Sequence, residues 1–162
     1  MCIRDSINGF KSFYEKTTVD FSNKVNVIVG PNGSGKSNVV DAISWVLGTQ
    51  SPATLRTNKM EDVIFAGTEK LSKKGFAEVY LNFEVDEKLF NGNSEISIGR
   101  KLFRDGTSEY FMNGLNCRLL DIQEFLNDVG IGKQQHIIIS QGQIAEISVS
   151  YTHLRAHETR SD

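Results

Sequence analysis

The sequence predicts an α/β or α+β chain with a mixed sheet, rather than a regular doubly wound one. An apolar, β-branched run at 25–30 ends at a glycine, and a helical pattern follows almost at once at 36–47. The segment 75–86 then alternates apolar and polar residues, which predicts a strand with one wetter face. Two more strand patterns flank Asp105-Gly106, a dipeptide typical of hairpin turns. We therefore expect a strand, a helix and then an antiparallel block.

The first helix and the segments that follow it can be placed from local patterns. Gly48 stands where a C-terminal cap of the helix would lie. The polar segment 49–59 predicts a loop, and 60–65 predicts a short helical turn. The face of the first helix that we expect to be buried consists of Val39, Val40, Ile43, Val46 and Leu47.

The second half of the chain predicts further strands and one more helix. Strand patterns occur at 95–104 and 108–113, and Asn113-Gly114 marks a second turn. Helical spacing at 119–129 predicts a second helix, which Gly130 would end. The apolar run 137–139 predicts a buried strand.

Composition and charge place the chain among ordinary globular proteins. Of its 162 residues, 39% are hydrophobic and 23% are charged, which suits a single domain with one core. No run of about 18 apolar residues occurs, so no membrane span is predicted. The first residues also lack the apolar stretch of a secretory signal. A net charge of -2 is not the footprint of a nucleic-acid binder, so any DNA contact would need a local patch or a larger assembly.

Cysteines and histidines provide no sign of a structural bridge or a metal site. Cys2 and Cys117 do not suggest a disulfide framework, and neither has the spacing of a metal ligand. His153 and His157 are four residues apart, but two histidines without a third ligand make a weak metal site. A reducing, cytoplasmic setting is therefore the expectation.

The clearest functional signal is the segment 30–37, which reads GPNGSGKS and matches the pattern G-x-x-x-x-G-K-[ST] in full. Glycines let the backbone bring its amide groups close to phosphate oxygens, and the following helix directs its positive dipole end at the same anion. Lys36 would bridge the β- and γ-phosphates, and Ser37 would bind Mg²⁺. The nucleotide-binding residues predicted here are Gly30, Pro31, Asn32, Gly33, Ser34, Gly35, Lys36, Ser37 and Asn38.

A glycine-rich turn with an exposed lysine is the alternative interpretation of this segment. The motif lies between a predicted apolar strand and an amphipathic helix, which is the context that a phosphate-binding loop requires. The sequence therefore predicts the binding of ATP and Mg²⁺.

The residues around this loop resemble the N-terminal head segment of the structural maintenance of chromosomes (SMC) family, and most of all its bacterial chromosome-condensation members. Several separate motifs occur in the family's order, and the resemblance covers residues 7–148. The segments that carry it are 7–13, 37–48, 55–56, 59–67 and 138–142. The resemblance implies a P-loop NTPase fold of the ABC-ATPase type, present here as one half of a head.

The resemblance also implies roles that the residues alone do not establish. Gln141 would reach the Mg²⁺ and the attacking water, and Arg56 would lie near the nucleotide and respond to head engagement or DNA. Lys11 and Ser12 lie where family members contact the nucleotide. Taken alone, Gln141 is only a polar residue after a buried strand, and Arg56 is a residue of a solvated loop.

Four basic residues are weaker candidates for contacts with DNA phosphates, namely Lys59, Arg100, Lys101 and Arg104. The last three alternate with apolar residues on a predicted strand, and a solvated face explains that pattern equally well. Other polar and aromatic residues are expected to be structural. Trp45 and His136 should be packed, and Asp41 should make a local polar contact rather than take part in catalysis.

The parts that would complete ATP hydrolysis are not found in the sequence. An ATPase of this class needs a carboxylate that holds Mg²⁺ and a glutamate that orients water. In the family these come from a C-terminal lobe, beyond two coiled-coil arms and a hinge. The chain is therefore expected to bind ATP as a half-head without turning it over alone. The partners implied are that lobe, a second head in a homodimer, double-stranded DNA and kleisin-type subunits, at the nucleoid and without a membrane.

Both ends depart from the family pattern. Residues 1–6 replace a hydrophobic first strand, and 149–162 replace the start of a coiled-coil arm. Both look like non-native sequence, and the tail is expected to be disordered. The expected organisation is a leader at 1–6, a head lobe at 7–148 and a tail at 149–162.

Two other classes of function stay open. A repair ATPase of the RecF or RecN type, or a transporter ATP-binding subunit, would share the loop and the glutamine but should lack the segment 60–67 as it stands here. A nucleotide-sensing or structural module would bind ATP without a completing lobe. An ATPase assay with the C-terminal lobe, and its stimulation by DNA, would separate these classes.

Overall fold

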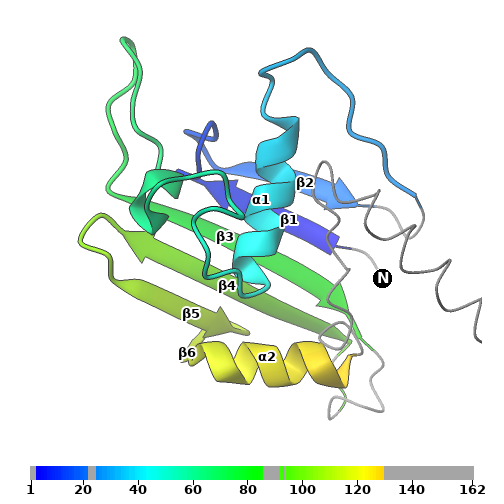
Figure 1. The fold of residues 1–162 in the computed structure, drawn as a ribbon. Helices are drawn as coiled ribbons and strands as arrows, with labels where there is room; N and C mark the ends of the chain where they lie inside the picture. Colours follow the sequence, from blue (N-terminus) through cyan, green and yellow to red (C-terminus); the bar gives the residue numbers. More distant parts are fainter. Residues whose placement is uncertain (1–2, 22–24, 86–91, 93, 130–162) are drawn as a thin grey trace, which may run out of the picture. The chain divides into compact units, whose positions relative to one another are not determined.

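The computed structural model describes residues 3–21, 25–85, 92 and 94–129, and their strands form one six-stranded antiparallel sheet (Figure 1). The strand order is β2-β1-β3-β4-β5-β6. The strands are β1 (Ile3–Asn8), β2 (Thr17–Phe21), β3 (Phe76–Glu84), β4 (Glu95–Phe103), β5 (Ser108–Met112) and β6 (Leu115–Cys117). The helices are α1 (Lys36–Val46), the 3-10 turn η1 (Met60–Val63) and α2 (Leu119–Asp128).

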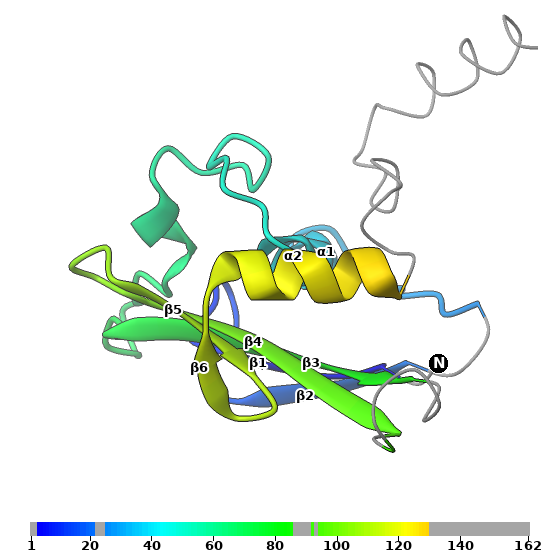
Figure 2. The ribbon, with the colours of Figure 1, turned by 90° about the horizontal axis from the view of Figure 1, so that it is seen from below.

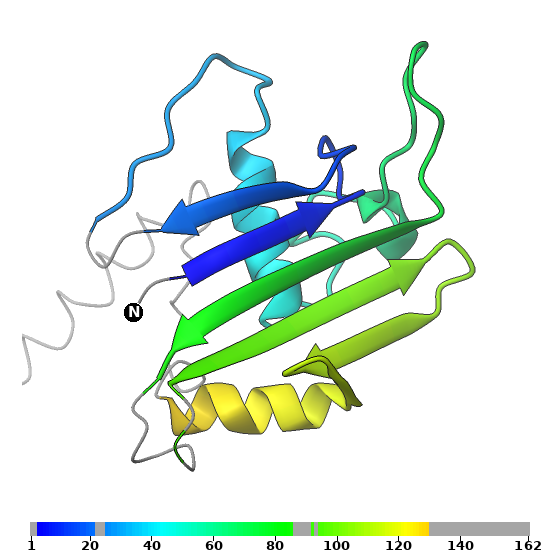
Figure 3. The ribbon, with the colours of Figure 1, turned by 180° about the vertical axis from the view of Figure 1, so that it is seen from behind.

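Both α-helices lie on the same face of the sheet (Figure 2). The opposite face is covered by none of the described helices (Figure 3). Along β3 the residues that point toward the helices are buried and those between them are partly exposed, as the alternation in the sequence predicted. Within the described part of the chain, no helix is long and apolar enough to cross a membrane.

The two predicted hairpin turns are confirmed. Asn113 and Gly114 both have positive φ, at 50° and 78°, as a two-residue turn between β5 and β6 requires. Between β4 and β5, the Thr107 amide donates to the Asp105 side chain at 2.8 Å, and Gly106 has a φ of 86°. These local turns set the register of the antiparallel block that follows the first helix.

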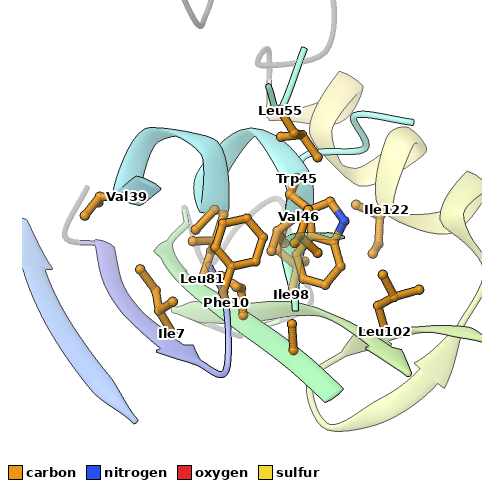
Figure 4. Packing of buried hydrophobic residues seen from close by; sticks show 14 of the residues in the cluster. Ile7, Phe10, Val39, Trp45, Val46, Leu55, Leu81, Ile98, Leu102 and Ile122 are labelled. Carbon is orange, nitrogen blue, oxygen red and sulfur yellow. The ribbon is translucent and has the colours of Figure 1, made fainter. Parts of the chain in front are cut away.

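The core lies between the sheet and α1, with α2 closing one end (Figure 4). Trp45 is fully buried, and its ring lies 5.3 Å from the ring of Phe10. Phe125 of α2 meets Phe83 of β3 edge to face at 6.1 Å. These packed faces anchor α1, and with it the N-terminal end of the helix where the loop 30–37 enters.

The expected buried face of α1 is partly wrong. Val39 and Val46 are buried, but Val40 is 42% exposed, and Ile43 and Leu47 are only partly buried. Besides Val39 and Val46, the helix buries Asp41, Ala42, Ser44 and Trp45. The reason is tertiary: α1 packs against the sheet on one side and receives Leu55 of the following loop on another, so periodicity alone does not select the buried stripe.

The predicted strand at 25–30 is also wrong. This segment has no regular structure, and Val25, Val27 and Val29 are 88%, 77% and 83% exposed. A β-branched run favours extended backbone, but a strand needs a neighbouring strand for its hydrogen bonds, and none of the described strands pairs with it.

Three elements of the sheet were not foreseen. β2 and β6 were not predicted, since each is short and lies at an edge of the sheet. Residues 3–6, which the sequence sets apart as a leader, form the first part of β1, so the folded lobe starts before residue 7. The strand predicted at 137–139, Gly130 and the tail 149–162 lie outside the described residues.

Candidate functional site

The loop 30–37 leads directly into the N-terminus of α1. Gly35 is the residue that precedes the helix and has a φ of 89°, and Gly33 has a φ of 83°, so both positions favour glycine. Within the described part of the chain, no side chain caps this helix end and no acidic residue lies in its first turn. The positive dipole end of α1, which no described side chain caps, therefore fits an anionic phosphate group.

The ammonium group of Lys36 is held by the loop that precedes it. It donates to the carbonyl oxygens of Gly30 at 2.7 Å and Pro31 at 2.6 Å. Ser37 is exposed on the first turn of the helix. A cation and a hydroxyl thus lie at one end of α1, and they are the donor groups that a nucleotide phosphate and its Mg²⁺ require.

The segment after β1 packs against this loop. The Asn38 side-chain amide donates to Ser12 Oγ at 2.8 Å. A Cβ placed on Gly35 would lie only 2.7 Å from the same Oγ. Ser12, Gly35 and Asn38 are therefore brought together from separate parts of the sequence. The contact of Lys11 and Ser12 with a nucleotide, which the resemblance implies, stays a prediction.

A charged cluster of Lys11, Asp41 and Arg56 lies beside them, and we call it the Asp41 cluster. Asp41 Oδ2 accepts from Lys11 Nζ at 2.5 Å and from Arg56 Nη2 at 2.5 Å. Lys11 Nζ also donates to the carbonyl oxygen of Leu55 at 2.5 Å. Asp41 thus makes the local polar contact predicted for it, and it links two residues that the resemblance places near the nucleotide.

No sequence pattern predicted that Lys11, Asp41 and Arg56 form one cluster. Lys11 and Arg56 have positive φ, at 48° and 55°, although neither is a glycine, and no pattern in the sequence reveals this conformation. The signal that could have been used is Asp41 itself. Asp41 is the only carboxylate of α1, and a carboxylate that is buried requires a cationic partner.

Arg100 is corrected from a candidate DNA contact to a buried packing residue, since it is 2% exposed. Its Nη1 donates to the carbonyl oxygens of Trp45 at 2.9 Å and Thr49 at 2.8 Å. The guanidinium group also lies 4.7 Å from the Trp45 ring centre and 5.1 Å from that of Tyr110. Burial lowers the pKa of Arg100 from its ordinary value, and the neighbouring Tyr110 acts in the opposite direction.

Of the other three candidate DNA contacts, Lys101 and Arg104 have partners within the chain, and Lys59 is exposed. Lys101 lies on the opposite side of β4, with its ammonium group 4.3 Å from the Phe76 ring centre and 4.0 Å from Glu78 Oε2. Arg104 donates to the carbonyl oxygens of Lys74 and Phe65 at 2.6 and 3.0 Å. Lys59 is exposed before η1. Contacts of Lys59, Lys101 and Arg104 with DNA stay predictions.

Gln141 and His136 lie outside the described residues. The role of Gln141 at the nucleotide and the packing of His136 stay predictions. The described site therefore consists of the loop, the start of α1, Ser12 and the Asp41 cluster. This arrangement can bind a phosphate chain, and none of its described residues is placed as a general base.

Comparison with known proteins agrees with this geometry. The family model for the RecF/RecN/SMC N terminal domain matches residues 3–152. The chain is 53% identical over 143 residues to the chromosome partition protein Smc of Mycolicibacterium paratuberculosis, a match that covers 88% of this chain. It spans only 12% of the length of that relative.

Solved structures show the same fold. One, described as "Structural biochemistry of ATP-driven dimerization and DNA stimulated activation of SMC ATPases", has a TM-score of 0.83 at 34% identity and covers 89% of this chain and 88% of its own. An Smc head domain with an extended coiled coil, bound to the C-terminal domain of ScpA and derived from Pyrococcus furiosus, has a TM-score of 0.84 at 35% identity. That match covers 91% of this chain and 38% of the other.

Proposed function

Because the chain belongs to the RecF/RecN/SMC N-terminal domain family, we propose that it binds Mg·ATP as the N-terminal half of the ATPase head of a chromosome-organising SMC protein. The observation that carries the proposal is the loop 30–37 at the uncapped N-terminus of α1, with Ser12 packed against it. Gly33, Gly35 and Lys36 would hold the phosphates, and Ser37 would hold Mg²⁺. Gln141 would position the metal ion and the attacking water.

Hydrolysis would need a carboxylate and a glutamate in addition to the residues of the described site. A bound Mg²⁺ neutralises charge on the phosphates, while a carboxylate and a glutamate from the C-terminal lobe would complete the site. The exposed apolar segment 25–29 supports a head that is completed by a further lobe. The chain spans 12% of the length of an Smc relative. We therefore propose that the chain turns over ATP only when the C-terminal lobe and a second head are added.

The partners of the whole protein follow from the same relatives. One solved neighbour is bound to the C-terminal domain of ScpA, and another is described by ATP-driven dimerization and DNA stimulated activation. We propose a kleisin-type subunit of this kind, a second copy of the head and double-stranded DNA as partners, at the nucleoid in the cytoplasm. The relatives named as chromosome partition proteins favour this role over a RecF- or RecN-type repair ATPase or a transporter subunit.

Calorimetry of the whole chain with Mg·ATP tests the proposal. The parent chain should bind, and Lys36→Ala should lower the affinity at least about a hundredfold, since a charge-assisted contact to the phosphates is removed. Lys101→Ala, which removes a lysine from the opposite side of β4, is the control and should bind like the parent. Equal affinity of the parent and Lys36→Ala would refute the site.

Addition of the C-terminal lobe of an Smc relative tests the second half of the proposal. Turnover that appears with the lobe, and rises with double-stranded DNA, would establish an ATPase of a DNA-organising machine. Tight binding without turnover, even with the lobe present, would favour the alternative of a non-catalytic nucleotide-binding module.

A further inference from the structure

The face of the sheet away from α1 and α2 carries aromatic rings, and none of the described helices covers it (Figure 3). On β3, Phe76 and Tyr80 are partly exposed and alternate with buried residues that point toward the helices. The register places Phe103 of β4 opposite Phe76. It places Phe111 of β5 in the same cross-strand row as Tyr80, with Gly99 of β4 between them. The ring centroids are 6.2 Å apart in the Phe76 pair and 5.9 Å apart in the Tyr80 pair, and we call this surface of β3, β4 and β5 the open aromatic face.

Gly99 allows the Tyr80 ring to lie over the sheet. A Cβ placed on Gly99 would be 2.4 Å from two carbon atoms of that ring, so the ring occupies the space above the glycine. Tyr80 is nevertheless only partly buried. The side of its ring away from Gly99 is therefore available to a partner.

The open aromatic face also carries more negative than positive charge. On the described strands β3, β4 and β5, one lysine points to this face, and the carboxylates that point to it are Glu78, Glu84, Glu95 and Glu109. Glu84 and Glu95 stand directly opposite each other, and like charges in such a pair repel. The face therefore attracts cationic groups and repels phosphates.

The lysine of this face, Lys101, occupies only one of the two ring pairs. Its Nζ lies 4.3 Å from the ring centre of Phe76 and 5.1 Å from that of the opposite ring. It also lies 4.0 Å from Glu78 Oε2. Among the described residues, no cation lies over the Tyr80 pair, and the Glu109 side chain in the neighbouring row forms no hydrogen bond or ion pair. The Tyr80 pair and Glu109 are therefore open to a cation from outside the chain.

From this arrangement we propose that the open aromatic face is a docking surface for an arginine-bearing segment of a partner protein. A guanidinium group of that segment stacks on the Tyr80 pair and pairs with Glu109. Arginine suits both contacts, because its planar group stacks on aromatic rings and forms paired hydrogen bonds with a carboxylate. Lys101 shows the same combination of ring and carboxylate within the chain. The surface lies on the side of the sheet away from α1, so the inference does not depend on nucleotide binding.

The environment of Tyr80 agrees with this chemistry. Burial raises the pKa of Tyr80 from its ordinary value, and the charges of Glu78 and Glu109 raise it further. A single exposed ion pair contributes little, because water and salt screen it. A segment with several arginines meets the carboxylates and the rings together, and this combination provides the affinity.

Fluorescence anisotropy of a fluorescein-labelled peptide of six Arg-Ala repeats with the whole chain tests the proposal. The parent should bind, and Glu78→Gln/Glu109→Gln should weaken binding at least about tenfold, since it removes the carboxylates beside the rings. Tyr80→Leu keeps an apolar cover over the sheet but removes the ring, so it should weaken binding about threefold. The control Glu69→Gln/Glu124→Gln removes the same charge from exposed positions outside this face and should bind like the parent.

Lys101→Ala distinguishes a protein partner from a nucleic acid. The variant removes the positive charge of the face, so the peptide should bind it about twofold to threefold more tightly than the parent. A 20-base-pair DNA duplex that binds the parent and is weakened by Lys101→Ala would assign the face to nucleic acid and overturn the proposal. Equal weakening of the peptide by both glutamine double variants would also overturn it, because the attraction would then depend only on net charge.

A second measurement uses the parent chain alone. The ring-proton resonances of Tyr80 and Phe111 should shift when the peptide is added to saturation, while those of Phe125, which is buried under α2, should stay in place. Binding of the peptide that leaves the Tyr80 and Phe111 resonances unchanged would locate the contact elsewhere and refute the docking surface.

Discussion

A single carboxylate in the middle of the sheet makes the stability of this chain depend on pH. Asp5 lies in β1 between β2 and β3, is fully buried, and has no hydrogen-bond partner for either carboxylate oxygen among the described residues. Burial raises the pKa of Asp5 from 3.8 to about 7.

The raised pKa of Asp5 leads to a prediction about unfolding. Between pH 4 and 7 the folded chain holds this proton more tightly than the unfolded chain, so the free energy of unfolding falls as the pH rises through this window, by at most about 4 kcal/mol. Urea denaturation followed by the fluorescence of Trp45, the single tryptophan, measures it. Asp5→Leu should remove most of this dependence and stabilise the chain at pH 8. A dependence that persists in this variant would locate its origin elsewhere.

The contact of Gly35 with Ser12 gives a second prediction for one residue. Gly35→Ala places a methyl group near Ser12 Oγ at a position with positive φ, so the loop 30–37 must move. We expect Mg·ATP affinity to fall at least about tenfold, since the loop amides lose their alignment. Gly75→Ala is the control, because an added Cβ there meets no atom within 4 Å. Calorimetry of both variants decides whether the loop conformation matters for binding.

At the scale of elements, Arg100 joins β4 to the C-terminal end of α1. Its guanidinium group donates hydrogen bonds to the carbonyl oxygens of Trp45 and Thr49. It also lies close to the rings of Trp45 and Tyr110. Positive charge at the C-terminus of a helix is also favourable to its dipole. Through α1, this contact helps to hold the phosphate loop at the opposite end of the helix.

Loss of Arg100 should therefore destabilise the whole lobe. Arg100→Ala removes the hydrogen bonds to the carbonyl oxygens of Trp45 and Thr49 and leaves a cavity beside Trp45, so it should lower the free energy of unfolding by roughly 2–4 kcal/mol. Arg100→Lys should restore little, since lysine lacks the planar group that stacks and forks. The neighbouring Lys101→Ala should change stability by less than about 1 kcal/mol, because it breaks only a partly exposed ion pair. Urea denaturation curves of the three variants provide the measurement.

At the scale of the whole molecule, the described lobe leaves an apolar surface uncovered. Val25, Val27 and Val29 are exposed ahead of the phosphate loop, and Val40 is exposed on the helix that follows it. Exposed apolar residues that lie close together along the chain, as Val25, Val27 and Val29 do, mark a protein contact or an aggregation-prone surface. The incomplete head proposed above would bury them against its C-terminal lobe.

Replacement of two of these valines tests that assignment. Val27→Thr/Val29→Thr keeps β-branched side chains but lowers their apolar character, so it should weaken binding of the C-terminal lobe at least about tenfold. Leu115→Thr, at an equally exposed apolar position on β6, should have no effect. Sedimentation of each variant with the lobe measures the affinity. Equal binding by the double variant and the parent would place the lobe contact elsewhere.

The features that could be predicted from the sequence alone are those that depend on residues close together in the chain. Both α-helices, the alternation of β3 and the turns at Gly106 and Gly114 depend on neighbouring residues, so their patterns were sufficient for prediction. The phosphate-binding site predicted at 30–37 rests on the same kind of local motif.

The tertiary structure decided whatever depends on a distant partner. Arg100 and Lys101 are adjacent, yet one is buried under α1 and the other lies on the opposite face of the sheet, because sheet burial depends on what covers each side. The apolar segment 25–30 remains unpaired because no described strand lies beside it, although its residues favour a strand. Asp41 meets Arg56 only because a loop returns over α1, and a contact of this kind leaves no period in the sequence.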